Sequence, residues 1–360
     1  MKIKTKIQEQ LYLLYKKKEI KEHALKYLFL EITRKCNLNC LHCGSDCKNT
    51  INDPELTTES WIKLIHFVHQ TYGNQVAFIL TGGEPLLHPD IFLIGKTISS
   101  LGMRWGMVTN GTLISETTIN QLIEAGIYSI TISFDGNEDS HNYIRNTHSA
   151  YKQVLKALQL IAKSNIAMRD AVTCVYPGNV KQLDEISELL LAHSFPAWRL
   201  FRIFPSGRAA NNENLLLTYE QTWEMVNWIK KTKPTLAKRG LSVNYSCEGY
   251  LPYETDRKIR DVPFFCRAGI NIASILSNGF ITGCSNNHST FYEGNVLTDN
   301  FSYIWENRFE KFRKREWLNK TTCADCKDLS KCKGSSIHLW NLEKEEIAFC
   351  YLKNNSTHRP

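Results

Sequence analysis

Short apolar runs alternate with helical patterns from residue 27 to residue 204. Runs rich in β-branched and aromatic residues predict strands at 27–33, 75–81, 104–110, 128–134, 167–175 and 197–204. Apolar residues at helical spacing predict helices between them, among them 59–72, 115–125, 150–164 and 180–192. Such alternation is typical of an α/β fold with a parallel sheet and crossover helices. Six units are too few for an eight-stranded barrel, so a partial (β/α)6 barrel and a doubly wound sheet both fit, with ligands at the carboxyl ends of the strands.

The alternation stops after about residue 210. One more helix is predicted at 217–232, and a hairpin with an Asn278-Gly279 turn is predicted at 272–284. The remaining elements are short and contain cysteines, and bound metal can keep such a small region folded. We therefore expect four segments: a helical extension (1–26), a partial barrel (27–215), a bridging region (216–265) and a small cysteine-rich domain (266–360).

Composition narrows the class of protein. The chain has 360 residues, 42% of them hydrophobic, which is ample for a core, and its net charge is +8. Lysines and arginines are spread out rather than clustered, which argues against a nucleic-acid partner. No apolar run near the start is long enough for a signal peptide or a membrane span. The sequence predicts a cytoplasmic protein that does not bind membranes.

The chain has 12 cysteines, and their spacing indicates a metal–sulfur protein. Disulfides are rare in the cytosol, so metal binding is the better explanation. All but Cys174 and Cys247 fall into three groups: Cys36, Cys40, Cys43 and Cys47; Cys266 and Cys284; Cys323, Cys326, Cys332 and Cys350. Zinc sites usually combine two separated cysteine pairs, whereas closely spaced thiolates hold four-iron clusters. The first group therefore favours iron and sulfur.

The spacing Cys36-x3-Cys40-x2-Cys43 after the first strand resembles the radical S-adenosylmethionine (SAM) superfamily, with His42 where an aromatic residue is usual. This resemblance implies a 4Fe–4S cluster whose open iron binds SAM. It also implies reductive cleavage of SAM to a 5′-deoxyadenosyl radical that abstracts a substrate hydrogen, with an external donor of the flavodoxin or ferredoxin type. Cys47 is either a fourth ligand that closes the cluster or a bystander.

Motifs at the ends of the next strands strengthen this resemblance. The stretch "TGGEP" (81–85) is similar to the motif that holds the SAM amine, and "TNG" and "SFDG" end the third and fourth strands. The resemblance assigns SAM binding to Gly82, Gly83, Glu84, Asn110, Ser133, Asp135 and Arg145. Asn110 and Asp135 are equally well explained as turn residues that cap a strand.

The later cysteines, together with Gly279, are spaced as in the SPASM extension of radical SAM enzymes, which houses one or two auxiliary 4Fe–4S clusters. By this resemblance the outer cluster is bound by Cys323, Cys326, Cys332 and Cys350. The inner cluster would use Cys266 and Cys284, with Cys247 as a candidate third ligand. The family has another cysteine where this chain has Ser336, so the inner cluster is open, smaller or absent. A zinc knuckle remains the alternative for the C-terminal group.

SPASM enzymes mostly modify peptides, and this chain resembles a bacterial group paired with ribosomally made precursor peptides. The resemblance implies an oxidoreductase that cross-links, oxidises or epimerises a peptide residue. Two alternatives remain. One is an anaerobic sulfatase-maturing enzyme, which carries an aspartate where this chain has Ser285; the other is a non-catalytic zinc-stapled binding module.

Two further features bear on the substrate. The residues before the first strand are too few for a leader-binding domain, so we expect another surface or a separate protein to recognise the leader. Arg199, Arg202 and Arg208 lie in the stretch "RLFRIFPSGRA" (199–209), which ends the sixth strand. These arginines either bind SAM or a substrate carboxylate or have a structural role.

Overall fold

The structure is a computed structural model that describes residues 2–48, 54–246 and 248–352. Its centre is a ten-stranded sheet of order β10-β9-β8-β1-β2-β3-β4-β5-β6-β7. The strands from β8 to β7 in this order are parallel, and β9 and β10 add in antiparallel fashion. The strands are β1 (Tyr27–Thr33), β2 (Ala77–Gly82), β3 (Trp105–Thr109), β4 (Ser129–Ser133), β5 (Met168–Val175), β6 (Ala197–Arg202), β7 (Ser242–Tyr245), β8 (Ile272–Ile275), β9 (Phe280–Thr282) and β10 (Gly294–Asn295).

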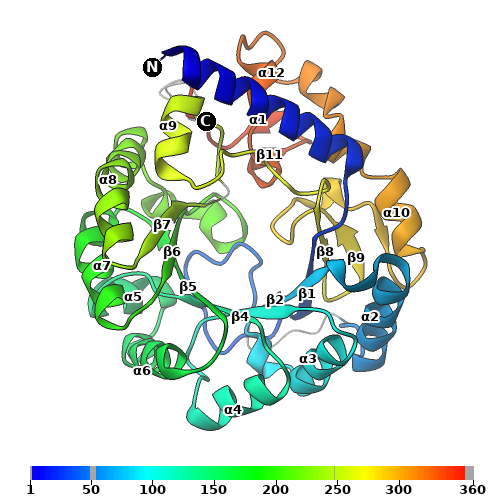
Figure 1. Cartoon of the computed structure of the whole chain (residues 1–360), viewed down its shortest axis with the longest axis vertical. Helices are drawn as coiled ribbons and strands as arrows, with labels where there is room; N and C mark the ends of the chain where they lie inside the picture. The colour runs from blue at the N-terminus through cyan, green and yellow to red at the C-terminus, as the bar shows by residue number, and fades with distance from the viewer. Residues whose placement is uncertain (1, 49–53, 247, 353–360) are drawn as a thin grey trace.

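The sheet curves into an open barrel with helices around its outside, which confirms the predicted partial barrel (Figure 1). The outer helices are α2 (Thr58–Tyr72), α3 (Ile91–Ser100), α4 (Glu116–Glu124), α5 (Glu138–Arg145), α6 (Ala150–Lys163), α7 (Leu183–Ala192) and α8 (Tyr219–Lys238). Each predicted helix appears because one apolar stripe faces the sheet. In α2 this stripe consists of the buried residues Trp61, Leu64, Ile65 and Val68.

The strand β1 shows why the apolar runs became central strands. Leu28, Leu30 and Ile32 are fully buried. The strand lies between β2 and β8, both parallel to it. Parallel strands covered on both faces need near-continuous apolar sequence, and β1 provides it.

The parallel sheet extends further than the six predicted strands. Helix α8 leads into β7, which pairs in parallel with β6, so residues from the predicted bridging region 216–265 complete the sheet. At the other edge β8 pairs in parallel with β1. Both additions have only four residues. Four residues are too few for a periodic pattern to stand out, which is why the sequence did not indicate their place in the sheet.

The predicted hairpin at 272–284 is present, but its turn is not the predicted two-residue turn. Leu276 donates its N–H to the carbonyl of Phe280, and Gly279 donates to the carbonyl of Leu276. The loop is therefore three residues long (277–279), and Gly279 has the positive φ, 89°, that this loop type requires. The Asn-Gly pair signalled the turn but not its length.

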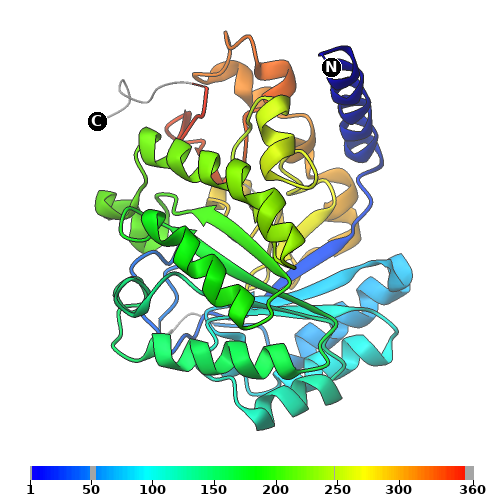
Figure 2. The same ribbon diagram turned by 60° about the vertical axis from the view of Figure 1, so that its left-hand side comes forward.

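Apart from β8, β9 and β10, the last third of the chain consists of short elements, which lie toward one end of the barrel (Figure 2). These are α9 (Tyr253–Ile259), α10 (Phe301–Asn307), α11 (Glu310–Arg313), α12 (Leu329–Cys332), β11 (Trp340–Asn341) and β12 (Glu346–Ile347). The N-terminal helix α1 (Lys2–Glu22) lies beside them. Lys16 on α1 donates to the carbonyl of Lys331, and Lys331 pairs with Glu9 at 2.7 Å. The two ends of the sequence thus form one layer.

Candidate active site

The first cysteine group lies in the loop that follows β1. Cys36 and Cys40 are buried, Cys43 is half-buried, and Cys47 is buried beside them. Cys36 donates its backbone N–H to the carbonyl of Lys48 at 2.9 Å, which closes the loop at its base. The structure therefore brings the three predicted cluster ligands together and places Cys47 with them.

Cys47 contacts Cys43 directly. The Cys47 thiol donates to the Ser45 carbonyl at 3.9 Å. Its hydrogen-bonding interaction with Cys43 is the main reason that the pKa of Cys43 falls to about 6. Burial, by contrast, raises the pKa of Cys36 to about 11. A hydrogen-bonded thiol at this position supports a neighbouring thiolate. The two alternatives for Cys47, fourth ligand or bystander, are both compatible with this contact.

Arg208 holds the cysteine loop in place from outside. Its Nε donates to the carbonyl of Cys40 at 2.6 Å, and its Nη1 donates to the carbonyl of Cys47 at 2.9 Å. Nη1 also pairs with Asp46 at 2.8 Å. The Arg208 guanidinium therefore hydrogen-bonds to the protein itself. Of the two roles that the sequence left open for Arg208, ligand binding and a structural role, the structure shows the structural one.

The two glycines of "TGGEP" allow the β2 loop to touch the start of the cysteine loop. A Cβ on Gly82 would lie 2.0 Å from the carbonyl oxygen of Thr33, and one on Gly83 would lie 2.2 Å from that of Lys35. The Gly83 N–H donates to the Thr33 carbonyl at 2.9 Å. Any larger residue would separate the two loops, so this close approach explains both glycines.

Glu84, the third residue of that motif, is fully buried behind the loop. It accepts hydrogen bonds from the Thr109 hydroxyl at 2.9 Å and from the Asn110 N–H at 2.8 Å, both at the end of β3. Burial raises its pKa to about 7. Its carboxylate thus ties β2 to β3, and its assignment to the SAM amine stays a prediction.

Arg145 and Asp135 form a buried pair next to the cysteines. The Arg145 Nη2 lies 2.5 Å from Asp135 Oδ2, and its Nη1 donates to the Cys40 sulfur at 3.7 Å. Burial alone would raise the pKa of Asp135, but the guanidinium holds it below its ordinary value. Asp135 also accepts the Cys174 N–H at 2.8 Å. Asp135 therefore orients Arg145, and Arg145 carries the charge that faces the cysteine loop.

A cavity of about 850 Å³ opens at the carboxyl ends of the strands. Of the predicted site residues, those that line it are Cys36, Cys40, Cys43, Gly82, Gly83, Asn110, Ser133, Arg145, Cys266 and Cys284. Glu84 and Asp135 lie behind this lining rather than in it. The structure thus joins the first and second cysteine groups in one space, a juxtaposition that sequence spacing could not reveal.

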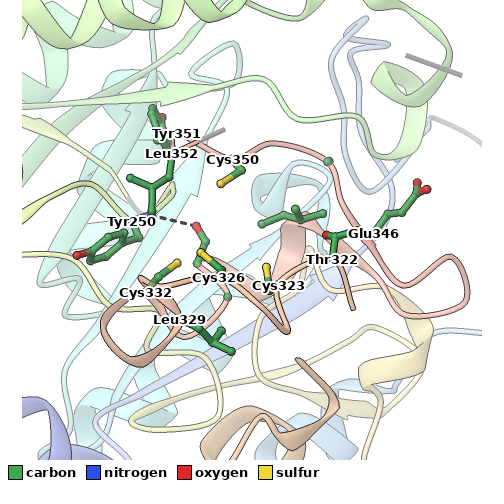
Figure 3. A pocket seen from close by; sticks show the side chains of 14 residues that line it. Tyr250, Thr322, Cys323, Cys326, Leu329, Cys332, Glu346, Cys350, Tyr351 and Leu352 are labelled. Atoms are coloured by element: carbon green, nitrogen blue, oxygen red, sulfur yellow. Dashed lines mark hydrogen bonds between the residues drawn. The ribbon is translucent and has the colours of Figure 1, made fainter. Parts of the chain in front are cut away.

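The C-terminal cysteines surround a separate, smaller cavity of about 140 Å³. Figure 3 shows the side chains of Cys323, Cys326, Cys332 and Cys350 around it. Burial raises the pKa of Cys332 to about 12. Thiols gathered from separate segments around an apolar space are the donor set of an iron–sulfur cluster.

The inner auxiliary site is less complete. Cys266 and Cys284 both line the large cavity, and burial raises the pKa of Cys284 to about 11. Ser336 is fully buried, and its hydroxyl accepts a hydrogen bond from the Gly249 N–H at 3.2 Å. At this position the Ser336 hydroxyl therefore binds a backbone amide. Cys247 lies outside the described residues. Its role as a third ligand stays a prediction.

The thiols fit iron–sulfur clusters better than single zinc ions. Free thiols are found at Cys36, Cys40, Cys43, Cys266, Cys284, Cys326, Cys332 and Cys350. Within the described ranges, no three or more Cys, His, Asp or Glu side chains are arranged to hold one metal ion. A four-iron cluster spaces its thiolates around a larger body than a single ion does, and the donors are all soft sulfur. The residues present therefore fit the clusters that the sequence implied.

Fold and cysteine sites together define an iron–sulfur enzyme of the α/β partial-barrel class. Comparison with family models identifies the enzyme class more closely. The radical SAM superfamily model matches residues 30–190, and the model of the iron-sulfur cluster-binding SPASM domain matches residues 266–327. The chain belongs to the radical SAM superfamily and carries a SPASM domain. Its cofactors are SAM and 4Fe–4S clusters, so the non-catalytic zinc module is excluded.

Curated relatives act on more than one kind of substrate. The chain is 27% identical to an AdoMet-dependent heme synthase of Methanosarcina barkeri, over 87% of this chain and 91% of that protein. It is 27% identical to an Fe-coproporphyrin III synthase of the same organism, over 84% and 81%. It is 24% identical to a PqqA peptide cyclase of Bradyrhizobium diazoefficiens, over 83% and 78%.

Solved structures share the fold. Streptococcus suis SuiB bound to its precursor peptide SuiA matches with a TM-score of 0.71 at 15% identity, over 94% of this chain and 78% of that one. Separately, no helix among the described residues is long and apolar enough to cross a membrane.

Several residues of the large cavity had no signal in the sequence. Arg260, Arg267, Tyr245 and His338 line it, and the sequence assigned a role to none of them. Arg267 directly follows Cys266, and this adjacency was the only available hint. The other three come from segments whose place in the fold was not predicted.

Proposed function

We propose that this protein is a radical SAM maturase that modifies a residue of a ribosomally made peptide by cross-linking, oxidation or epimerisation. The observation that carries the proposal is the cavity of about 850 Å³, which runs from the SAM-type cysteine loop to Cys266 and Cys284. Small-molecule sites have roughly 300–1,000 Å³. This cavity is at the upper end of that range, which leaves room for a substrate segment beside the cofactor.

Two comparisons support a peptide as substrate. The neighbour SuiB was solved with a precursor peptide bound. A sequence relative is named as a peptide cyclase. By contrast, Ser285 lines the cavity where sulfatase-maturing enzymes carry an aspartate, which disfavours that alternative.

The chain's own residues prepare the site in three ways. Arg208 fixes the cysteine loop through two carbonyls. Gly82 and Gly83 bring backbone close to the space where a cofactor binds. Arg145, oriented by Asp135, presents a fixed positive charge to a carboxylate. When bound, the first cluster supplies the electron for reductive cleavage of SAM.

Anaerobic reconstitution tests the proposal. The iron-loaded protein is incubated with SAM, a low-potential reductant and the small peptide encoded beside its gene. The peptide mass is then measured, and the chirality of the peptide residues is determined after hydrolysis. We expect 5′-deoxyadenosine to form and the peptide to change by the mass of lost hydrogens, or to gain a D-residue at unchanged mass. Samples without SAM serve as the control. An unchanged peptide with continuing 5′-deoxyadenosine formation would contradict the peptide assignment.

A second candidate is oxidation of a carboxylate-bearing tetrapyrrole. The heme synthase and Fe-coproporphyrin III synthase relatives suggest it. The cavity also has a cationic lining with several phenylalanines, among them Phe201, Phe204 and Phe265. Incubating the same preparation with Fe-coproporphyrin III decides between the two: loss of side-chain carboxylate carbon favours this candidate, and an unchanged tetrapyrrole favours the peptide.

A further inference from the structure

Nearly all the charged side chains that line the large cavity are paired within the protein. The described lining has six arginines and two acids, Glu31 and Asp261. Each arginine has an acidic partner at 3.9 Å or less. Asp261 pairs with Lys233 at 2.7 Å. Glu31 differs, because it forms no ion pair with any residue that the structure describes.

Glu31 points into the barrel from the central strand β1. Its side chain is buried, with the residue only 5% exposed. Phe29, two positions earlier on the strand, lines the same cavity, as expected because alternate residues of a strand face the same side. Thr81, which pairs in register with Glu31 on β2, lines it as well. The carboxylate is therefore part of the inner wall of the barrel.

The two carboxylate oxygens of Glu31 have different surroundings. Oε1 accepts hydrogen bonds from the Ser277 N–H at 3.3 Å and from the Ser277 hydroxyl at 3.1 Å. Oε2 accepts no hydrogen bond in the described part of the chain, yet it is not one of the unpartnered atoms that the protein encloses. Oε2 therefore keeps surface open to the cavity that Glu31 lines. Ser277 fixes the carboxylate and leaves its second oxygen for a ligand.

The burial of Glu31 without a counter-charge costs free energy. Burial raises the pKa of Glu31, and the Ser277 hydrogen bonds and the more distant Arg34 guanidinium oppose this rise only in part. Glu55 adds to the rise. A cationic group on a ligand would supply the missing counter-charge, as the protein's own side chains do for the other charges of this wall.

Glu31 is held from the SPASM side of the cavity. Ser277 lies in the loop between β8 and β9, within the residues that match the SPASM model. The residues that resemble the SAM motifs, among them Gly82, Gly83 and Arg145, come from β2 and from α5. The position of Ser277 therefore favours the substrate, rather than SAM, as the source of the cation.

We infer that Glu31 Oε2 binds an ammonium group of the substrate, either a lysine side chain or the N-terminus of a peptide. Ser277 is the positioning residue that orients the carboxylate. Because arginines dominate the rest of the described wall, Glu31 gives an ammonium group its most favourable position in the cavity. This inference rests on the proposed function in one respect, that a peptide occupies this cavity.

Equilibrium binding to the reconstituted, SAM-loaded enzyme tests the inference. The probes are the precursor peptide encoded beside the gene with its amines free and the same peptide with its amines acetylated, which removes their charge. We expect Glu31→Gln to weaken binding of the free-amine peptide by about 10- to 100-fold, as loss of a hydrogen bond to a charged group does. The acetylated peptide should bind wild type and variant within about twofold of each other.

Asp261→Asn is the matched control, because it removes the other carboxylate of the described lining. Asp261 is 62% exposed and already paired with Lys233, so we expect its loss to change binding of the free-amine peptide less than about twofold. The amide oxygen of Glu31→Gln can still accept from Ser277, which favours folding of that variant. If it does not fold, Glu31→Met carries the same comparison with an uncharged side chain of similar length.

SAM also carries an ammonium group, so SAM binding to each variant is measured separately in the absence of peptide. Four outcomes would overturn the inference. They are equal losses for free and acetylated peptide, equal effects of Glu31→Gln and Asp261→Asn, a loss of affinity confined to SAM, or failure of wild type to bind the free-amine peptide below millimolar concentration.

The inference and the proposed function can fail separately, because binding is measured without a reductant and hence without turnover. A peptide that binds through Glu31 but is not modified would refute the proposed function and leave the inference intact. A peptide that is modified, but whose binding does not depend on Glu31, would do the reverse.

Discussion

The two cysteine sites at opposite ends of the sequence are built differently. The front group comes from one loop and faces a cavity of about 850 Å³ that it shares with glycine backbone and arginines. The C-terminal group comes from one stretch (323–332) and from Cys350, and it lines a cavity of only about 140 Å³ with apolar neighbours. The first has room for more than a cluster, and the second does not. Both sites contain four cysteines, so the difference between them is the free volume around the thiols. A large volume fits a site for substrate chemistry, and a small one fits a site for electron storage or folding.

The strongest test of this contrast is Cys40→Ala in the front loop. Loss of a residue that only supports a metal ligand lowers metal affinity or activity by roughly 10- to 100-fold. Cys40→Ala removes a ligand itself, so we expect 5′-deoxyadenosine formation to fall by more than this. The measurement is 5′-deoxyadenosine by chromatography, together with iron content. Circular dichroism should show that the fold survives, since the barrel core does not depend on this loop. Undiminished SAM cleavage would refute the assignment of Cys40.

A smaller and more selective loss is expected for Cys326→Ala in the C-terminal site. Substrate modification should disappear while some SAM cleavage continues, because the front cavity does not include this cysteine. The ratio of modified product to 5′-deoxyadenosine reports the selectivity. If substrate modification, SAM cleavage and the melting temperature all fall together, the C-terminal cluster is structural. The functional difference between the two cysteine sites would then be smaller than their cavities suggest.

The mildest effect is expected for Cys47→Ala, the matched partner of Cys40→Ala. The interaction with Cys47 lowers the pKa of Cys43, so loss of the Cys47 thiol should raise that pKa. Cluster retention should weaken by no more than the roughly 10- to 100-fold that a supporting partner contributes to a metal site. Iron content and SAM cleavage after reconstitution provide the measurement. A loss as large as that of Cys40→Ala would mean that Cys47 is a fourth ligand.

Local sequence signals predicted much of the barrel. The six longer strands and their helices appeared because a buried parallel sheet demands apolar runs at regular intervals. The short strands β7 and β8 were not placed, because four residues carry too little pattern. The hairpin at Gly279 was predicted from its turn residues, yet its loop length depended on how Leu276 and Phe280 pair.

The sequence by itself determined the chemistry of the chain, since thiol spacing and the glycine motif are local and follow directly from chain order. Only the tertiary structure decided what each charged side chain does. It turned Arg208 to the cysteine loop, placed Glu84 and Asp135 behind the cavity, and brought Arg202 and His338 to either side of Glu248. The physical reason is that the role of a charged group is set by its nearest partners. In a curved sheet those partners come from segments far apart in sequence, so no local pattern records them.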